Sequence, residues 1–404
     1  MSQKYPGGII SKTAPVTVGP VDGEGGSAPG VWTLTQALEL NKQNLWPKPV
    51  IPKELYAWGF NNYGGLGLGD VVLRSSPVQV GALTTWSQIA ASSYFAGATK
   101  TDGTLWGWGY NNFGQLGGND TIFRSSPVQV GALSTWQQIA AGSQFTVAIK
   151  TDGTFWSWGR NNFGQLGLGD VVSRSSPVQV GALTTWYQVA TGNGLCLATK
   201  TDGTLWSWGQ GYGGALGLGN NVYRSSPVQV GALTTWYQIA GGSNFAFAIK
   251  TDGTLWSWGY NFRGMLGLGD TANRSSPVQV GALTTWYKVA GGGNFAVATK
   301  TDGTLWVWGR NIQGQLGLND TADRSSPVQI GALTTWYVAA AGNLHTLATK
   351  TDGTLWSWGQ NGSGQLGLSD TAARSSPVQV GLLTTWSRLP KMPSSNSSLA
   401  LKTP

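Results

Sequence analysis

The chain has 404 residues, including 61 Gly and 22 Trp, and only 10% of its residues are charged. This length suits about two or three average domains, or one large β architecture. The hydrophobic fraction of 40% is enough for a buried core and argues against a disordered chain. A single Cys and a single His exclude a disulfide framework, a Cys-based zinc cluster and a multi-His metal centre. We therefore expect no cofactor and no metal.

The net charge of +8 comes from 25 basic and 17 acidic residues that recur through the chain rather than from a basic run. This spacing is typical of a solvated surface, so we do not expect a nucleic-acid partner. No apolar stretch approaches the roughly 20 residues that cross a bilayer, and we expect no membrane insertion. The start, MSQKYPGGIISK, lacks the pattern of a secretory signal.

The first 53 residues are expected to form an N-terminal arm. Residues 1–30 are rich in Gly and Pro, which favours an extended segment. In residues 31–47, Leu34, Leu38 and Leu45 form an apolar stripe that ends before Pro47, which predicts a short helix near 34–45. One short helix cannot bury its own apolar face, so this element should dock on another surface. The candidate anchor residues are Trp32, Leu34, Leu38, Leu45 and Trp46.

From residue 55 to residue 404 the sequence repeats with a period of 50 residues, which gives seven units. The Trp that ends TTW or STW falls at 86 and then at every fiftieth position to 386, and the Arg of RSSP runs likewise from 74 to 374. A period this long indicates a solenoid, an array or a propeller.

Each unit reads as short strands. In the unit from 136 to 186, WQQIAAG is apolar and FTVAIK alternates, with Phe145, Val147 and Ile149 on one side. The TDG at 151–153 is a tight-turn signal, TFWSWG follows as a third strand, and a Gly-rich loop leads to a fourth strand entered through Pro177. Four antiparallel strands per unit predict a propeller blade.

The two chain ends complement each other. The last unit ends at LALKTP without the strand that should follow, and the first begins with that strand, Leu55 to Gly59, without its partner. Pairing them would complete a blade and remove two open sheet edges. The fold class is therefore expected to be all-β, a seven-bladed propeller of residues 54–404 closed by pairing of N-terminal and C-terminal strands.

The strings GRNNFGQLGLGD, GQNGSGQLGLSD and AAGNLHTLATKTDGTLWSWG resemble repeats of the regulator of chromosome condensation family. The resemblance implies a seven-bladed propeller. The founding member is an exchange factor for a small GTPase and binds chromatin, and others are ubiquitin-ligase modules, enzyme inhibitors or uncharacterised bacterial and viral proteins.

Two departures from the family bear on activity. The exchange factor uses an inserted β wedge, whereas the repeats here keep their 50-residue spacing until a two-residue extension near Pro390, so no wedge fits. The family's G-x-x-H-T survives only around His345, and Phe or Leu replaces the His in other copies, for example Phe95 and Leu195. We interpret His345 as a core residue and expect a protein that is not an enzyme.

The loops recur with Asp and Arg four residues apart, as in Asp70 and Arg74, which predicts a loop-stabilising ion pair. Asn220 breaks this pattern before Arg224, where an anion or an acidic residue of a partner is an open alternative. The WxW pairs, such as Trp106 and Trp108, are interpreted as packing between blades, and the Gly-rich loops as tight turns rather than phosphate sites.

The near-identical units differ mainly after WG and before RSSP. These are loop positions, and loops vary without disturbing a scaffold. Aromatic residues and Arg are the types that anchor interfaces, although neutral drift between duplicated units explains the variation equally well. The candidate interaction residues are Phe60, Tyr63, Tyr110, Phe113, Arg160, Phe163, Tyr212, Tyr223, Tyr260, Arg263 and Arg310.

The arm gives the only hint of biological context. Its composition resembles stretches in structural proteins of tailed phages, where a Gly/Ser/Pro linker leads into a GVWTL…LWP element. We therefore expect a non-enzymatic virion protein, attached to other virion proteins by its arm and presenting the propeller to a host surface protein or glycan. The alternatives are a soluble, cytoplasmic protein-binding regulator or inhibitor, and a glycan-binding propeller; the arm can also be a strap across its own domain.

Overall fold

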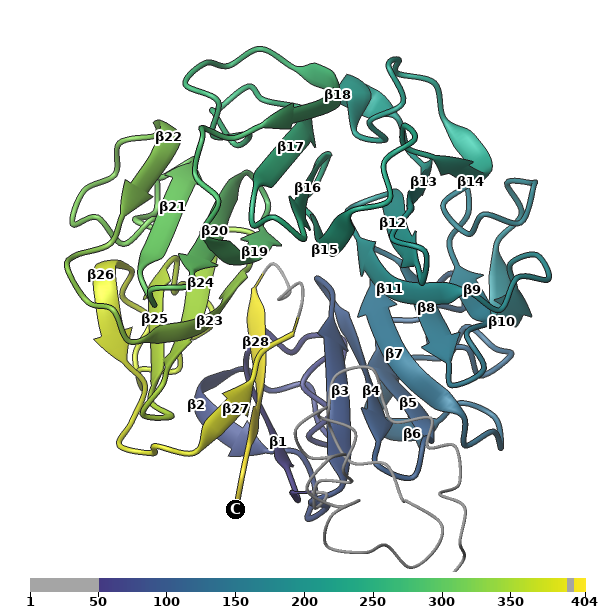
Figure 1. The fold of residues 1–404 in the computed structure, drawn as a ribbon. Coiled ribbons are helices and arrows are strands. Elements are labelled where there is room, and N and C mark those ends of the chain that lie inside the picture. The colour runs from purple at the N-terminus through teal and green to yellow at the C-terminus, as the bar shows by residue number, and fades with distance from the viewer. Residues whose placement is uncertain (1–50, 391–395) are drawn as a thin grey trace, which may run out of the picture. The chain divides into compact units, whose positions relative to one another are not determined.

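The computed structural model describes residues 51–390 and 396–404. These residues form seven four-stranded antiparallel sheets arranged radially around a centre (Figure 1). The expected all-β, seven-bladed propeller is thus confirmed. The helix expected near 34–45 and the anchor residues Trp32, Leu34, Leu38, Leu45 and Trp46 lie outside the described residues. No helix in the described part of the chain is long and apolar enough to cross a bilayer.

Six blades are each built from four consecutive strands, counted here from the centre outward. The first strands are β3 (Trp86–Ala91), β7 (Trp136–Ala141), β11 (Trp186–Thr191), β15 (Trp236–Gly241), β19 (Trp286–Gly291) and β23 (Trp336–Ala341). The second strands are β4 (Phe95–Lys100), β8 (Phe145–Lys150), β12 (Leu195–Lys200), β16 (Phe245–Lys250), β20 (Phe295–Lys300) and β24 (His345–Lys350). The third strands are β5 (Leu105–Gly109), β9 (Phe155–Gly159), β13 (Leu205–Gly209), β17 (Leu255–Gly259), β21 (Leu305–Gly309) and β25 (Leu355–Gly359). The fourth strands are β6 (Arg124–Gln129), β10 (Arg174–Gln179), β14 (Arg224–Gln229), β18 (Arg274–Gln279), β22 (Arg324–Gln329) and β26 (Arg374–Gln379).

The sequence signals explain most strand bounds. Asp-Gly turns join second to third strands, and Gly153 takes a φ of +76°, which a residue with a Cβ adopts at a cost. All six residues of β8 are buried, as expected for a sheet covered on both faces. One boundary was wrong: the fourth strand begins at Arg174, and Pro177 lies within it at an irregularity of the pairing. An outermost strand tolerates Pro because its ladder needs no donor there.

The seventh sheet joins the two ends of the propeller, in the order β2 (Arg74–Gln79), β1 (Glu54–Gly59), β28 (Ser397–Lys402) and β27 (Trp386–Arg388). We call it the closing blade. Strands β1 and β28 pair in register from Glu54 with Lys402 to Gly59 with Ser397. Lys402 Nζ also lies 3.0 Å from Glu54 Oε2. The predicted closure is confirmed.

Each blade is tied to its neighbour through one Trp of its third strand, which is the second Trp of the WxW pair in six blades and Trp58 in the closing blade. Trp108 is fully buried, and its indole Nε1 donates to the main-chain oxygen of Gly65 in the preceding blade at 3.0 Å. The same bond crosses the closure, from Trp58 to the oxygen of Gln365 at 2.9 Å. The first Trp of the pair, Trp106, is only partly buried and lies under Lys100, whose Nζ is 3.5 Å from the ring centroid.

His345 is a core residue, as the sequence comparison suggested. It is fully buried, and its Nε2 lies 3.0 Å from Ser398 Oγ in β28. Because that hydroxyl donates to the oxygen of Gln365, the imidazole Nε2–H must be the donor to Ser398. Burial lowers the pKa of His345 from 6.5 to about 4, since the apolar surroundings disfavour the imidazolium.

The depressed pKa of His345 predicts a pH-dependent free energy of unfolding. Stability that is present above pH 6.5 should be lost as the pH falls from 6.5 to about 4, by about 3 kcal/mol in all. His345→Phe introduces the residue that most other repeats have at this position. It should remove this part of the pH dependence of the free energy of unfolding. Urea unfolding at pH 7.5, 6.0 and 5.0 measures this free energy for the native chain and the variant. If it falls equally with pH in both proteins, His345 is not the group responsible.

Candidate functional site

The antiparallel meander places connections of two kinds at opposite ends of every blade. The segments joining first to second strands and third to fourth strands share one end, which we call the loop face. There the main-chain N–H of Tyr110 donates a hydrogen bond of 3.0 Å to the main-chain oxygen of Tyr94, which joins the two kinds of segment. The Asp-Gly turns and the connections between blades share the other end, which we call the turn face. The variable positions after WG all lie in loop-face segments.

Five aromatic rings meet on the loop face, across the closing blade and the blade of β3 to β6. Tyr63 has its ring centroid 5.2 Å from that of Tyr94, 5.1 Å from Tyr110 and 5.8 Å from Phe123. Phe60 lies 6.3 Å from Tyr63 and 6.0 Å from Tyr94. Tyr110 and Phe123 are 4.9 Å apart. We call these five residues the aromatic patch.

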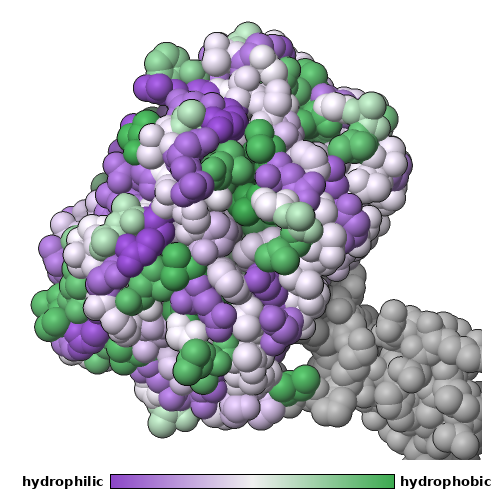
Figure 2. Space-filling view, turned by 90° about the vertical axis from the view of Figure 1, so that its left-hand side faces the viewer, coloured by the Kyte–Doolittle hydropathy of each residue, from purple (hydrophilic) through white to green (hydrophobic). Residues whose placement is uncertain are grey.

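The aromatic patch is exposed and uncharged. Tyr63, Tyr94 and Phe123 are 36%, 37% and 41% exposed. Ile122, next to Phe123, is 60% exposed. By contrast, the outer wall on the side of β22 and β26 shows hydrophobic residues only as small areas among hydrophilic ones (Figure 2). A cluster of exposed rings of this kind marks an interaction surface.

The other candidate residues fall into two further groups, except one. The guanidinium of Arg160 lies 5.1 Å from the ring centroid of Phe113 and 5.7 Å from that of Phe163, which in turn contacts Tyr223 at 5.6 Å. The third group consists of Tyr212, Tyr260, Phe262 and Arg263, and Arg263 also pairs with Asp323 at 3.3 Å. No ring contact is found for Arg310 among the described residues, so the structure does not bring it into a group.

Sequence reasoning missed Tyr94 and Phe262. Tyr94 precedes the second strand, where other copies have Gln144, Gly194 or Asn244. Comparing the repeats at that position as well would have found it. Its place beside Tyr63 depends on two loops meeting, which no repeat comparison shows.

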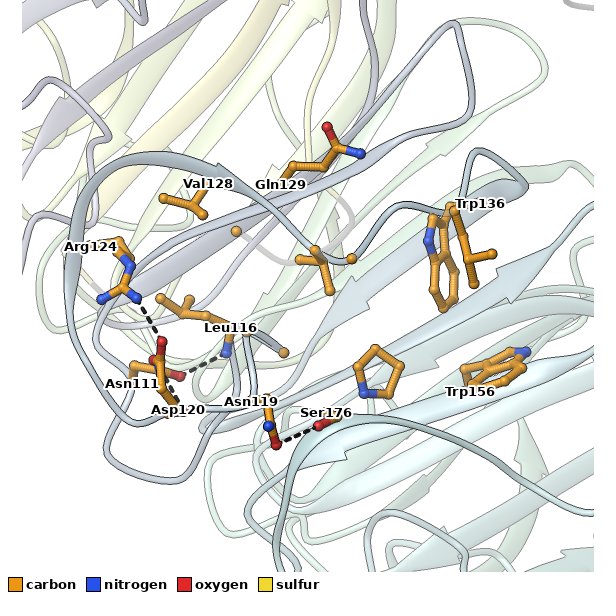
Figure 3. Close-up of a pocket in the computed structure, with 17 residues that line it drawn as sticks. Asn111, Leu116, Asn119, Asp120, Arg124, Val128, Gln129, Trp136, Trp156 and Ser176 are labelled. Atoms are coloured by element: carbon orange, nitrogen blue, oxygen red, sulfur yellow. Dashed lines mark hydrogen bonds and ion pairs between the residues drawn. The ribbon is translucent and has the colours of Figure 1, made fainter.

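A pocket of about 430 Å³ lies on the outer side of the segment 110–123 (Figure 3). Its apolar walls include Leu116, Val130, Trp136 and Trp156. Its polar edge includes Asn119, whose Oδ1 accepts a hydrogen bond from Ser176 Oγ at 3.0 Å. The pocket therefore borders the same loop that carries Phe123.

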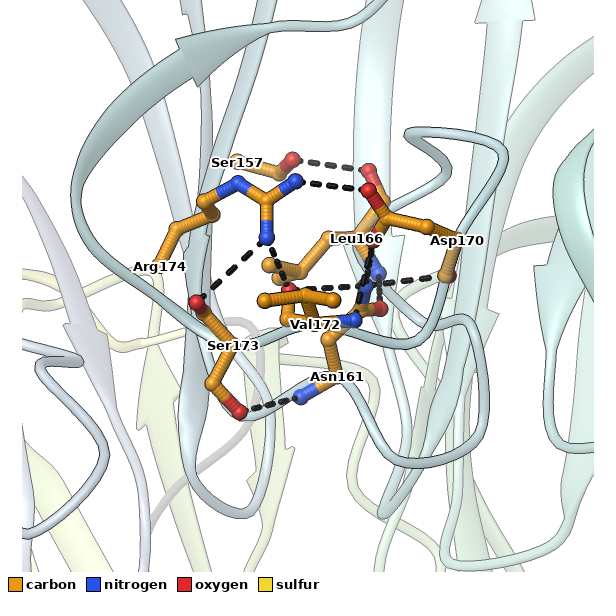
Figure 4. Close-up of polar contacts among 7 residues, drawn as sticks. All are labelled: Ser157, Asn161, Leu166, Asp170, Val172, Ser173 and Arg174. Atoms are coloured by element: carbon orange, nitrogen blue, oxygen red, sulfur yellow. Dashed lines mark hydrogen bonds and ion pairs between the residues drawn. The ribbon is translucent and has the colours of Figure 1, made fainter.

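A buried Asn holds the segment between the third and fourth strands in shape in six of the seven blades, and Figure 4 shows the example of Asn161. Asn161 Nδ2 donates to the main-chain oxygens of Asp170 and Val172 at 3.0 and 3.1 Å, and its Oδ1 accepts from the Leu166 N–H at 2.9 Å. Asp170 pairs with Arg174 at 2.6 Å, so the predicted ion pair is confirmed. The pKa of Asp170 is lowered, first by the hydrogen bond from the Val172 N–H; desolvation opposes this, and the hydrogen bond and charge of Arg174 lower the pKa further.

The fourth repeat lacks both ends of this network. Gly211 replaces the Asn and Asn220 replaces the Asp, and the loop forms a short 3-10 turn, η1 (Tyr212–Gly214). Asn220 Oδ1 still accepts from the Val222 N–H at 3.0 Å. Arg224 makes no ion pair with a described carboxylate, and whether an anion binds there stays a prediction.

Two observations on the described residues concern metal binding and the one cysteine. No group of three or more His, Cys, Asp and Glu side chains in this part of the chain is placed to hold a metal ion. Cys196 is fully buried, and burial raises the pKa of its thiol well above the usual value, which disfavours the reactive thiolate. The loop-face groups are suited to non-covalent recognition.

The regulator of chromosome condensation (RCC1) repeat model matches seven segments of the chain: residues 54–99, 102–149, 152–199, 202–249, 252–299, 302–349 and 352–388. A second model of the same repeat matches residues 86–115, 136–165, 236–264 and 286–315. No curated protein sequence matches the chain.

Several solved structures share the fold. Yeast RCC1 (Prp20) bound to Kap60 is 20% identical with a TM-score of 0.79, over 88% of this chain and 89% of that one. Human WBSCR16 is 22% identical with a TM-score of 0.78, over 87% and 99%. Prp20p from Saccharomyces cerevisiae, in a structure whose description names its binding to Gsp1p and histones, is 22% identical with a TM-score of 0.77, over 88% and 92%.

Removal of the buried amide should loosen one loop without unfolding the propeller. Asn161→Ala leaves the Leu166 N–H and two main-chain oxygens without their partner, so we expect a loss of about 1–3 kcal/mol in the free energy of unfolding. The exposed neighbour Asn162 provides the control, and Asn162→Ala should change stability by less than about 0.5 kcal/mol. Urea unfolding compares the two, and equal effects would show that the network does not hold the loop.

Proposed function

Because the chain belongs to the regulator of chromosome condensation (RCC1) repeat family, we propose that it is a non-enzymatic protein-binding propeller whose partner docks on the aromatic patch. The observation that carries the proposal is the contact of Tyr63, in the closing blade, with three rings of the neighbouring blade, which makes an exposed, uncharged surface on a rigid scaffold. Such rings supply much contact area at a low cost in side-chain entropy, as the anchors of interfaces do.

The similar structures support a protein as the partner. Yeast RCC1 was solved with Kap60, and the description of Prp20p names Gsp1p and histones. These are partners of those proteins. For this chain they favour a protein as the partner and do not indicate which protein it is. The absence of a wedge-like insertion between the evenly spaced repeats leaves binding or regulation as the better-supported role.

A glycan-binding role is less well supported by the ring geometry. A sugar stacks on the open face of an aromatic ring, whereas Tyr63 meets Tyr94, Tyr110 and Phe123 edge to face at interplanar angles between 70° and 83°. Rings packed edge to face in this way do not form the flat, open platform on which a sugar stacks. A glycan array on which the protein binds a defined sugar would reverse this preference.

The narrower hypothesis of a tailed-phage virion component stays a prediction. The arm and anchor residues that suggest it lie outside the described residues, and the family match speaks for a protein-binding propeller in general. A virion location requires the protein in purified particles at a fixed stoichiometry, which mass spectrometry measures. Deletion of residues 1–50 should then leave a folded propeller that is lost from the particles.

The docking surface can be tested by site-specific crosslinking. A photo-reactive phenylalanine analogue replaces Phe123 on the loop face or Leu283 on the turn face, which are 41% and 47% exposed. We expect one protein to be crosslinked from position 123 and not from 283. With that partner purified, Tyr63→Ala should weaken binding at least about tenfold, or 1.4 kcal/mol, and Leu283→Ala should leave it unchanged.

The reverse pattern would place the partner on the turn face. Equal crosslinking at both positions, or binding that Tyr63→Ala leaves intact, would remove the aromatic patch from the function. Circular dichroism of Tyr63→Ala provides the folding control, since an exposed ring contributes little to the core.

A further inference from the structure

The pocket beside segment 110–123 exists because one blade lacks a side chain that every other blade has. Position 118 is Gly, whereas the six other repeats have Leu at the same place. Those residues are Leu68, Leu168, Leu218, Leu268, Leu318 and Leu368. Position 107 is also Gly, where the other repeats have Ala, Ser or Val. The blade of β3 to β6 is therefore hollowed at one position in its outer wall.

The sister repeats show what fills this space elsewhere. Leu68 packs against a cluster that contains Leu66, Val80, Trp86 and Trp106. The pocket is lined by the residues that stand 50 positions later, which are Leu116, Val130, Trp136 and Trp156 (Figure 3). Each wall of the leucine site is thus present, and the leucine is missing. Leu116 is 6% exposed, whereas the equivalent Leu66 is fully buried.

The polar groups of the pocket do not demand a polar occupant. Asp120 is paired with Arg124, and its Oδ1 also accepts from Asn111 Nδ2 at 3.0 Å. The indole Nε1 of Trp136 has no acceptor among the described residues, but the same is true of Trp86, which lies in a cluster packed by Leu68. With an aliphatic occupant in the pocket, the Trp136 N–H would therefore be in the same state as the Trp86 N–H, which has no acceptor beside Leu68.

The pocket lies beside the loop that also carries Phe123, although no ring of the aromatic patch is among its lining residues. Asp120 lines the pocket, and Ile122 and Phe123 follow within three residues on the same loop, 60% and 41% exposed. A partner that docks on Phe123 and extends along this loop would reach the pocket. Burial of one leucine side chain in such a site removes its apolar surface from water and so favours binding.

We propose that this pocket accepts a leucine-like aliphatic side chain of the protein partner, in the place that the repeat's own Leu occupies in the six other blades. The proposal rests on the proposed function, since it takes the occupant from the partner that docks on the aromatic patch. The pocket then gives specificity for one blade out of seven, which the repeated scaffold otherwise lacks.

Gly118→Leu is the deciding variant, because it restores the residue of the other repeats. A Cβ at Gly118 would have as its nearest atom Asp120 Oδ2 at 3.7 Å, and the backbone of Gly118 is outside the left-handed region. The variant should fold and unfold at the same temperature as the native chain or a higher one. Its thermal unfolding curve checks this before any binding is measured.

The first measurement uses N-acetyl-leucine methylamide as probe and the indole N–H signal of Trp136 as reporter, assigned with Trp136→Phe. We expect a saturable NMR shift at millimolar concentration, no shift with N-acetyl-glycine methylamide, and no shift in Gly118→Leu. Leu168→Gly should open the equivalent pocket in the next blade and add a response of the Trp186 signal to that of Trp136. A missing response to the leucine probe, or one that persists in Gly118→Leu, overturns the pocket.

The second measurement uses the partner identified by crosslinking. Gly118→Leu should weaken its binding at least tenfold. If the leucine probe binds but Gly118→Leu leaves partner affinity unchanged, the assignment of the occupant is wrong. If Tyr63→Ala does not affect partner binding, the partner does not dock on the aromatic patch. The titration with the leucine probe tests the pocket independently of that result.

Discussion

Seven hydrogen bonds of one kind hold the propeller together. In each blade a buried Trp of the third strand donates its indole N–H to a main-chain oxygen of the preceding blade, at 2.9 to 3.1 Å. A buried donor without such a partner costs about 1–3 kcal/mol, so every blade needs its neighbour. The approach is close: a Cβ at Gly67 would lie 2.8 Å from Trp108 Nε1. Since the acceptor belongs to the main chain, its residue can be Gly65, Ala215 or Met265 without loss of the bond.

This arrangement separates what must be constant from what can vary. Buried Trp and Gly, with the Asn and Asp of each loop, fix the backbone, and side chains on the loop surface are free to differ. Variation at Phe60, Tyr110 or Arg160 therefore leaves the scaffold intact and changes only what the loop face offers a partner. For the same reason, a residue change at a position that is otherwise the same in all repeats is informative, because the scaffold does not require that change.

Two repeats depart in this way, with different consequences. In the fourth, Gly211 and Asn220 change together, and a short turn replaces the amide network, so the structure compensates for the loss. In the second, Gly118 replaces a Leu and nothing refills the space, which leaves the pocket on the loop that carries Phe123. A compensated change preserves the scaffold, whereas an uncompensated one opens a site. The pocket and the aromatic patch together distinguish one part of the ring from the rest.

The sequence by itself determined the architecture, because a 50-residue period, turn signals and a divided hairpin leave one closed solution. It also determined that His345 is packed and that Asp170 pairs with Arg174, since copies of a repeat report on each other's environment. Only the tertiary structure decided which variable residues meet: Tyr63 and Tyr110 are 47 positions apart, and Tyr94 joins them from another loop. It also decided that Gly118 leaves a pocket. Contacts between blades depend on the angle at which rigid sheets pack, and a period along the chain does not encode that angle.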